Sequence, residues 1–433
     1  MQNKRRVMKR GMLAIALAVV APVTAMAAPI SVLFVGNSFT FGRADPVMSY
    51  NADKVNDLTR PGQAGNPSFN NTTGSNAFEP HPWGGVAGIF KEFTEQAGLQ
   101  YEVSLSTRNA ASLRGHMLNT NPADWDLRGN IALQTWDKVV LQEQSDESLS
   151  LRPGLASNPA RFNNYVDKIA EYVKEGTLST YRERDYYEGA TNAEKTANCV
   201  AITGASNSNA CNAQRGTASG LSANFTLPVN PNASASTEVF LYQTWARPDM
   251  VTGALVSETD ETTGEVTRTT TPKTTYFADL ESMTEELRIA YERAGTQAGN
   301  IDGIAPVGEA FLRAVQSGIA TRDPYAADAL SDNLIDLWFD DAFHPSKYGS
   351  YLSALTLFGT LTGLNPAMFG ADEFAARELG ISATDAVALQ RVAALQLGYE
   401  VPEPGALALL GIGLAGLAAS RRRSRRQKSV PPA

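Results

Sequence analysis

The chain has 433 residues but only two cysteines and three histidines. Cys199 and Cys211 are too few for a metal cluster or a disulfide framework, although they could form one disulfide in an oxidising compartment. The histidines, His81, His116 and His344, offer only three imidazoles as possible bases. We therefore expect neither a metal site nor an organic cofactor.

Basic residues are also scarce in the central part of the chain. Residues 28–404 hold 26 of the 37 basic residues and all 45 acidic residues, which gives a net charge of −19. A surface of this charge repels phosphate backbones, so nucleic-acid binding is not expected. The other basic residues lie at the two ends, five within 1–27 and six within 405–433.

Residues 1–27 have the three parts of a secretory signal peptide. A basic stretch that includes Lys4 and Arg10 precedes an almost wholly apolar run over 11–23, and Ala25-Met26-Ala27 supplies a cleavage sequence. The alternative is a membrane anchor, but the apolar run is short for a helix that spans a bilayer. We expect signal peptidase to cleave after Ala27 and the body to be exported through the inner membrane to the periplasm.

Residues 401–427 contain a Pro-Glu-Pro triplet at 402–404, an apolar stretch over 405–419 and five arginines within 421–426. An apolar stretch followed by arginines predicts a stop-transfer helix with its basic end in the cytoplasm. The three parts in this order resemble the PEP-CTERM sorting tail of Gram-negative bacteria that make exopolysaccharide. The resemblance implies processing by an exosortase, delivery to the cell surface or extracellular matrix, and membrane contact only through the unprocessed tail. The alternative is a plain C-terminal anchor.

Residues 28–400 alternate short apolar runs with helical patterns. The expected strands are Ile30–Gly36, Tyr101–Thr107, Lys138–Gln144, Thr237–Trp245 and Gly303–Val307, with helices over 85–97, around 277–295 and from about Pro345. Such alternation predicts an α/β fold whose parallel sheet is covered on both faces. Stretches rich in small and polar residues near 43–80, 188–236 and 252–274 are predicted to be surface insertions in this domain.

The first expected strand ends in Gly36-Asn37-Ser38-Phe39, which places Ser38 at a strand end. Ligands of open α/β sheets bind beyond the carboxyl ends of the strands, where a nucleophile would lie. A serine in this position can equally cap the next helix. Ser38 is therefore a candidate nucleophile that needs a base and a group to orient that base.

The segment 338–354 supplies a candidate base, because Asp341 precedes His344 by three residues. This spacing lets one loop present both side chains, so that the carboxylate orients the imidazole. Asp340 is an alternative orienting carboxylate. Neither of the other two histidines has an acid at the same spacing. The alternative is that His344 is a solvated residue of a loop that caps a helix, since Pro345 suits the first turn of a helix.

Attack by a serine on an acyl group would also need hydrogen-bond donors for the oxyanion that develops. The candidates are the backbone N–H of Ser38, a backbone N–H near Ala110 and the carboxamide of Gln144. The alternative for Gln144 is a polar side chain that satisfies loop backbone.

Three further residues are candidates for substrate contacts. Asn37 lies in the same turn as Ser38, and Tyr242 and Trp245 end the fourth expected strand. Aromatic residues at strand ends are also common in protein cores, which is the alternative for the last two.

Taken together, these segments resemble the SGNH (GDSL-like) hydrolases over about residues 30–362, in a bacterial subgroup. Gly36-Asn37-Ser38-Phe39-Thr40 is similar to the first motif of that family in a GNSF variant, and Asp341-Ala-Phe-His344-Pro is similar to its Asp-x-x-His motif. The resemblance implies a three-layer α/β/α sandwich with a five-stranded parallel sheet and Ser38, His344 and Asp341 as nucleophile, base and orienting group. Two positions differ from the family pattern: alanines around Ala110 replace a glycine, and Gln144 replaces an asparagine.

The expected function is that of an exported serine esterase, and the sorting tail suggests an acylated extracellular polysaccharide as its substrate. The alternative is a catalytically inactive SGNH-like surface or carbohydrate-binding matrix protein. The two altered positions favour this alternative, whereas the presence of all three triad residues argues against it. A phosphate-binding turn is disfavoured because residues 36–39 contain one glycine and no lysine follows them.

Overall fold

The computed structural model describes residues 28–43, 45–60, 81–120, 126–203, 225–259, 266–271 and 273–400. The predicted signal peptide lies outside these ranges, as does the predicted stop-transfer helix over 405–419. Among the helices within these ranges, none is long and apolar enough to cross a membrane.

A six-stranded sheet forms the centre of the fold, in the order β10-β7-β4-β1-β3-β2, and all neighbouring strands are parallel. The strands are β1 (Ile30–Gly36), β2 (Asn56–Asp57), β3 (Tyr101–Thr107), β4 (Lys138–Gln142), β7 (Glu238–Tyr242) and β10 (Gly303–Ala305). Five of them confirm the predicted strands, but the predicted count of five is wrong. The extra strand, β2, has only two residues, too few to produce a recognisable sequence period.

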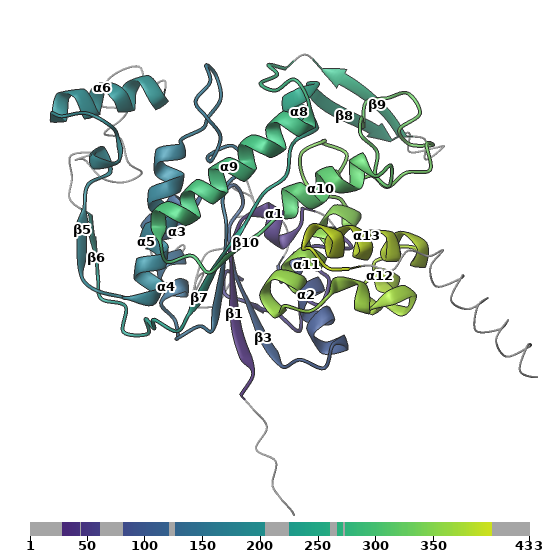
Figure 1. Ribbon diagram of the computed structural model, residues 1–433, viewed down its shortest axis with the longest axis horizontal. Coiled ribbons are helices and arrows are strands. Elements are labelled where there is room, and N and C mark those ends of the chain that lie inside the picture. The colour runs from purple at the N-terminus through teal and green to yellow at the C-terminus, as the bar shows by residue number, and fades with distance from the viewer. Residues whose placement is uncertain are drawn as a thin grey trace, which may run out of the picture.

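Helices cover both faces of this sheet (Figure 1). One layer contains α3 (Leu113–Leu118), α4 (Leu127–Ile131), α5 (Pro159–Lys174) and α9 (Leu280–Ala298), and the other contains α2 (Gly85–Gln96), α10 (Val307–Gln316), α11 (Lys347–Thr362), α12 (Phe374–Glu378) and α13 (Ala383–Gln396). Burial on both faces explains why the run from Val32 to Val35 is continuously apolar, since all four side chains are fully buried. The predicted three-layer α/β/α sandwich is confirmed.

The strand order changes direction at the carboxyl end of β1, a switch point where a crevice for ligands is expected. The chain leaves β1 to pair β3 on one side and later returns to pair β4 on the other. Such a switch of direction is where open α/β sheets bind ligands. The short helix α1 (Ser38–Phe41) begins at this point, so the topology places Ser38 at the crevice.

The segments predicted as insertions contain regular structure. Near 188–236 lie α6 (Asn192–Thr203) and β6 (Phe225–Leu227), which pairs with β5 (Ser179–Tyr181). Near 252–274 lies an antiparallel hairpin of β8 (Ala254–Thr259) and β9 (Val266–Thr271), preceded by α8 (Pro248–Val251). Short 3₁₀ helices span Glu183–Tyr186 (η1), Pro366–Met368 (η3) and Gly370–Asp372 (η4). Cys199 in α6 is disulfide-bonded, and the chain's other cysteine, Cys211, lies outside the described residues.

Candidate active site

Ser38 opens α1 directly after β1, and its hydroxyl faces an imidazole. Asn37 caps α1, because its side-chain Oδ1 accepts the Phe39 N–H at 3.1 Å. Ser38 Oγ lies 2.9 Å from His344 Nε2, although the two residues are 306 positions apart. Their exposed fractions are only 4% and 5%. The fold therefore brings the predicted nucleophile and the predicted base into hydrogen-bond contact away from bulk water.

A tight turn presents Asp341 and His344 from one loop. The Phe339 N–H donates to the His344 carbonyl at 2.7 Å, and an antiparallel bridge joins Trp338 to Pro345. Ala342 has a φ of +53°, which lets the chain reverse between the acid and the histidine. This turn accounts for the three-residue spacing that was visible in the sequence.

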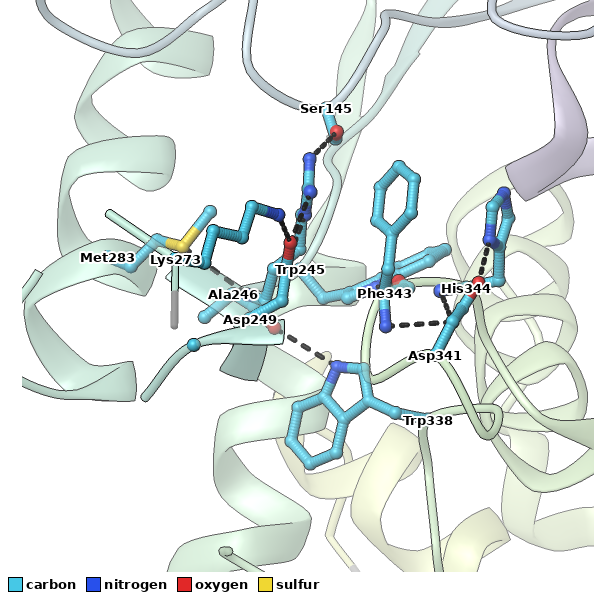
Figure 2. A network of polar contacts seen from close by, with 12 residues as sticks. Ser145, Trp245, Ala246, Asp249, Lys273, Met283, Trp338, Asp341, Phe343 and His344 are labelled. Atoms are coloured by element: carbon cyan, nitrogen blue, oxygen red, sulfur yellow. Dashed lines mark hydrogen bonds and ion pairs between the residues drawn. The ribbon is translucent and has the colours of Figure 1, made fainter. Parts of the chain in front are cut away.

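Asp341 holds the imidazole and the backbone of the same turn. Its Oδ2 lies 2.6 Å from His344 Nδ1, and its Oδ1 accepts the backbone N–H groups of His344 at 2.8 Å and Phe343 at 3.0 Å. Figure 2 shows the carboxylate of Asp341 directed at the imidazole. The carboxylate in this position is Asp341 rather than the alternative, Asp340.

The environment of Asp341 favours its ionised form. Partial burial acts to raise the pKa of this carboxyl, but the hydrogen bonds from His344 and Phe343 hold it below its ordinary value. An ionised Asp341 accepts a proton-bearing Nδ1, which leaves Nε2 unprotonated and facing Ser38. The contacts therefore favour the tautomer in which His344 accepts the Ser38 proton.

Gln142, the last residue of β4, fixes the turn that carries the serine. Its Oε1 accepts the Asn37 N–H at 2.9 Å and the Thr40 hydroxyl at 2.9 Å, and the side chain is fully buried. A Cβ on Gly36 would lie 2.5 Å from Thr40 Oγ1 and 2.6 Å from Gln142 Oε1, so this approach requires glycine. The side-chain carboxamide that reaches the Ser38 turn from the end of β4 is thus that of Gln142.

Gln144, predicted as an oxyanion donor, lies two residues beyond the end of β4. Its backbone N–H donates to Glu143 Oε1 at 2.7 Å, and its carbonyl accepts the Glu147 N–H at 3.2 Å. The predicted strand ran to residue 144, whereas β4 ends at Gln142, and this difference explains the misplacement. The signal that could have identified Gln142 is its place as the first polar residue after three apolar ones.

The backbone N–H groups of Ser38 and Ala110 stay predicted oxyanion donors. Among the described residues, the N–H groups of Ser38 and Ala110 have no hydrogen-bond acceptor. Ala110 is exposed in the loop after β3 and has a φ of +54°, a conformation that favours glycine. The residue that replaces the expected glycine therefore keeps a glycine-like backbone.

The three predicted substrate-binding residues have structural roles. Asn37 Nδ2 donates to the Ala111 carbonyl at 3.0 Å while its Oδ1 caps α1, so both ends of this carboxamide contact protein. Tyr242 is fully buried and lies beside Ser353 of α11 rather than at the crevice. These two side chains are therefore engaged within the fold.

Trp245 is also fully buried, and it supports the site through contacts with residues next to Ser38 and His344 in the sequence. Its ring stacks on Phe39 at a centroid distance of 4.3 Å and on Phe311 at 4.8 Å, and its Nε1–H donates to the Phe343 carbonyl at 3.1 Å. The prediction of substrate contact by Tyr242 and Trp245 is wrong, because neither side chain is accessible.

The other two histidines have separate environments. His116 is fully buried and donates its Nε2–H to the Gly36 carbonyl at 2.9 Å, and burial lowers its pKa to about 4. It is therefore neutral at physiological pH and supports the end of β1. His81 Nδ1 lies 2.7 Å from Asp57 Oδ2, a pairing missed in the sequence because 24 residues separate the two.

Three carboxyl groups, those of Glu143, Asp146 and Glu147, are buried in the loop after β4. Glu143 accepts the N–H groups of Leu113 at 3.0 Å and Gln144 at 2.7 Å, and burial together with the nearby Glu147 raises its pKa well above the ordinary value. Burial also raises the pKa of Glu147 to about 7, against the opposing effect of Arg161, which lies 3.3 Å away. The loop after β4 therefore buries acids whose pKa values are raised.

No metal site accompanies this arrangement in the part of the chain that the structure describes, where no three His, Cys, Asp or Glu side chains are grouped to hold an ion. A cavity of about 560 Å³ lies between α5, α6 and α9 and is lined by Tyr186 and Tyr187 among others. Neither Ser38 nor His344 lines it, so it is separate from the candidate active site.

Comparison with known proteins identifies one sequence motif. Residues 400–423 match the PEP-CTERM protein-sorting motif, which confirms the predicted sorting tail and implies export and processing by an exosortase. No curated protein matches the chain.

Solved structures that are similar to the chain include the following three. A candidate SGNH hydrolase from Slackia heliotrinireducens has 16% identity and a TM-score of 0.35, covering 77% of this chain and 100% of its own. A DUF4886 family protein from Bacteroides uniformis has 14% identity and a TM-score of 0.40, with coverages of 87% and 99%. A candidate GDSL-like lipase from Parabacteroides merdae has 13% identity and a TM-score of 0.35, with coverages of 76% and 94%. These similarities are remote, and none of them decides what this chain does.

Proposed function

We propose that this protein is an exported serine hydrolase that cleaves ester bonds with a triad of Ser38, His344 and Asp341. The observation that carries the proposal is the continuous contact from Ser38 Oγ to His344 Nε2 at 2.9 Å and from His344 Nδ1 to Asp341 Oδ2 at 2.6 Å. A serine becomes nucleophilic when a base lies within hydrogen-bond reach and a third group orients that base. Both contacts are made by residues from two distant parts of the chain.

The reaction proceeds in two halves. Ser38 Oγ attacks the acyl carbon while His344 Nε2 takes the hydroxyl proton, and the resulting imidazolium is stabilised by Asp341. The imidazolium then gives this proton to the leaving alcohol, which leaves an acyl ester on Ser38. In the second half His344 takes a proton from water as the water oxygen attacks the acyl carbon, and the imidazolium then returns this proton to Ser38 Oγ as the bond from Ser38 to the acyl carbon breaks, which releases the acid and restores free Ser38.

The developing oxyanion is stabilised by backbone donors in this proposal. The N–H groups of Ser38 and Ala110 come from the turn after β1 and the loop after β3, two strands that are neighbours in the sheet. Fixed donors of this kind lower the barrier because they need no reorganisation during the reaction. Gln142 contributes indirectly by fixing the turn that holds Ser38.

The proposed substrate class is inferred from the location to which the sorting motif directs the protein. The PEP-CTERM motif at 400–423 supports delivery beyond the inner membrane, where signal peptidase and an exosortase would process the chain. We place an acylated extracellular polysaccharide, for example one with acetyl esters, as the substrate. If the enzyme cleaves small esters but releases no acetate from such a polysaccharide, this substrate is wrong while the hydrolase remains.

A fluorophosphonate probe and p-nitrophenyl acetate test the hydrolase itself. We expect the wild type to be labelled and to turn over the ester, and Ser38→Ala to abolish both, because the probe reacts only with an activated serine. Ser317→Ala, at the exposed carboxyl end of α10, is the matched control and should behave as wild type. A folded wild type that neither labels nor turns over small esters would contradict the proposal.

The second candidate function is a catalytically inactive SGNH-like surface or carbohydrate-binding matrix protein. The observation that favours it concerns the oxyanion donors. The carboxamide of Gln142 accepts a hydrogen bond from the backbone of the Ser38 turn, and it is therefore engaged within the fold. Binding of the polysaccharide by a chain that resists labelling would support this candidate.

A further inference from the structure

The turn that carries Asp341 and His344 is called the catalytic turn below. The ring of Phe343, in this turn, connects it to a buried ion pair. Its centroid lies 4.3 Å from that of His344 and 5.2 Å from that of Phe39, the residue after the candidate nucleophile. The guanidinium carbon of Arg247 lies 3.6 Å from the centroid of the same ring. Phe343 is thus packed between the triad and a cation.

Arg247 is held in one orientation by its in-plane donors. Its Nε and one terminal nitrogen donate to Asp249 Oδ1 at 2.9 Å and Oδ2 at 2.7 Å, and the other terminal nitrogen donates to Ser145 Oγ at 2.7 Å. Arg247 is only 6% exposed and Asp249 only 3%. A planar guanidinium whose edges are occupied in this way presents a fixed face, and that face is the one stacked on Phe343.

The partners of Arg247 come from separate elements around the site. Ser145 lies in the loop after β4, and Asp249 lies in α8 after β7 (Figure 2). Asp249 also pairs with Lys273, which follows the hairpin strand β9 and has a side chain that is 40% exposed. The β8–β9 hairpin is therefore linked to the catalytic turn through two ion pairs and one aromatic ring.

We propose that Arg247 is a positioning residue that acts through Phe343 to hold His344 within reach of Ser38. The expected effect of Arg247 on kcat rests on the proposed function. Its expected effect on the position of His344 does not. Arg247 touches neither Ser38 nor His344 in the described contacts, so its effect is on geometry. Loss of the stacked cation lets the Phe343 ring and the turn move, which lowers the population of the 2.9 Å contact between Ser38 and His344.

The chain offers a matched control for Arg247. The Arg152 guanidinium carbon lies 4.3 Å from the centroid of the Phe277 ring, and its terminal nitrogens bind the Glu286 carboxylate at 2.8 Å and 2.5 Å. It therefore has the same two kinds of contact at a place that does not include the triad. Arg152→Met removes a stacked cation and an ion pair without touching the catalytic turn.

The kinetic test compares Arg247→Met with Arg152→Met on p-nitrophenyl acetate, using the full chain. We expect Arg247→Met to lower kcat by about ten- to a hundredfold with little change in KM, since small errors in catalytic geometry have effects of that size. Arg152→Met should leave kcat unchanged. In a Phe343→Leu background, Arg247→Met should have almost no further effect on kcat, because the ring through which it acts is gone.

A second readout does not depend on turnover. With only three histidines in the chain, the imidazole N–H protons can be assigned by single substitutions in 15N-histidine-labelled protein. The short bond from His344 Nδ1 to Asp341 should give a downfield proton signal in the wild type and in Arg152→Met. We expect Arg247→Met to broaden or remove this signal while the protein remains folded.

The outcomes separate the two proposals. If the wild type is active and Arg247→Met matches Arg152→Met in both kcat and the His344 signal, Arg247 is not a positioning residue although the hydrolase stands. If the wild type is inactive, the hydrolase fails, and the His344 signal alone then decides on Arg247. An additive effect of Arg247→Met and Phe343→Leu would also overturn the proposed route.

Discussion

At the scale of single residues, the exact strand end decides which side chain serves the site. Gln142 and Gln144 are two positions apart and chemically identical, yet only Gln142 contacts the turn that carries Ser38. The third strand was expected to end at Gln144, whereas β4 ends at Gln142. Strand boundaries are uncertain by a few residues, and in a strand each step of two moves a side chain along the same face.

We expect Gln142→Met to be far more damaging than Gln144→Met. The first change leaves two buried donors, the Asn37 N–H and the Thr40 hydroxyl, without an acceptor, at a cost of about 1–3 kcal/mol each. It should also reduce ester turnover, since Ser38 follows Asn37. Urea unfolding of both variants tests this, and equal losses of stability would show that Gln142 has no special place.

At the scale of elements, the site depends on how the segments that follow β1 and β7 pack against the turn that carries Asp341 and His344. Trp245, Phe39 and Phe343 pack together at this point. Motif and spacing were enough to propose Ser38, Asp341 and His344 together, because Asp341 and His344 share one short turn. The aromatic support could not be predicted in the same way, since its members are brought together only by the sheet order. The pairing of His81 with Asp57 was missed for the same reason.

Trp245→Phe should lower both stability and turnover. The change removes buried volume between Phe39 and Phe311 and leaves the Phe343 carbonyl without its donor, so we expect a loss of about 2–4 kcal/mol.

Trp136→Phe is the matched control for this change. Trp136 is also buried, at 2% exposure, and its Nε1–H donates to the Ile131 carbonyl at 3.0 Å. Thermal unfolding should show losses for both variants, whereas kcat on p-nitrophenyl acetate should fall only for Trp245→Phe. Equal kcat values would mean that the stack holds the fold but not the site.

At the scale of the whole molecule, the parallel sandwich explains why residues 306 positions apart form one site. All the strands of the central sheet run in the same direction, so their carboxyl ends share one edge. This architecture was predictable, because fully buried parallel strands such as Val32–Val35 leave continuous apolar runs. The two-residue β2 and the link from the β8–β9 hairpin to Arg247 were not, because both depend on tertiary pairing with no local sequence signal.

The same edge buries acids that make global stability depend on pH. Burial raises the pKa of Glu147 to about 7 from an ordinary value of 4.5. Between these values the folded chain keeps a proton that the unfolded chain has released, so this group lowers stability as pH rises through that window. The span corresponds to a loss on the order of 3 kcal/mol.

Glu147→Gln should remove this dependence, because the amide cannot ionise. Relative to wild type, the variant should gain stability between pH 5 and pH 8, whereas Glu102→Gln, a change at an exposed position of β3, should follow the wild-type curve in parallel. Urea midpoints at several pH values provide the measurement. A constant difference between Glu147→Gln and wild type would mean that Glu147 does not titrate in this window, and any pH dependence would then come from other groups, such as Glu143 and Asp146, whose pKa values are also raised by burial.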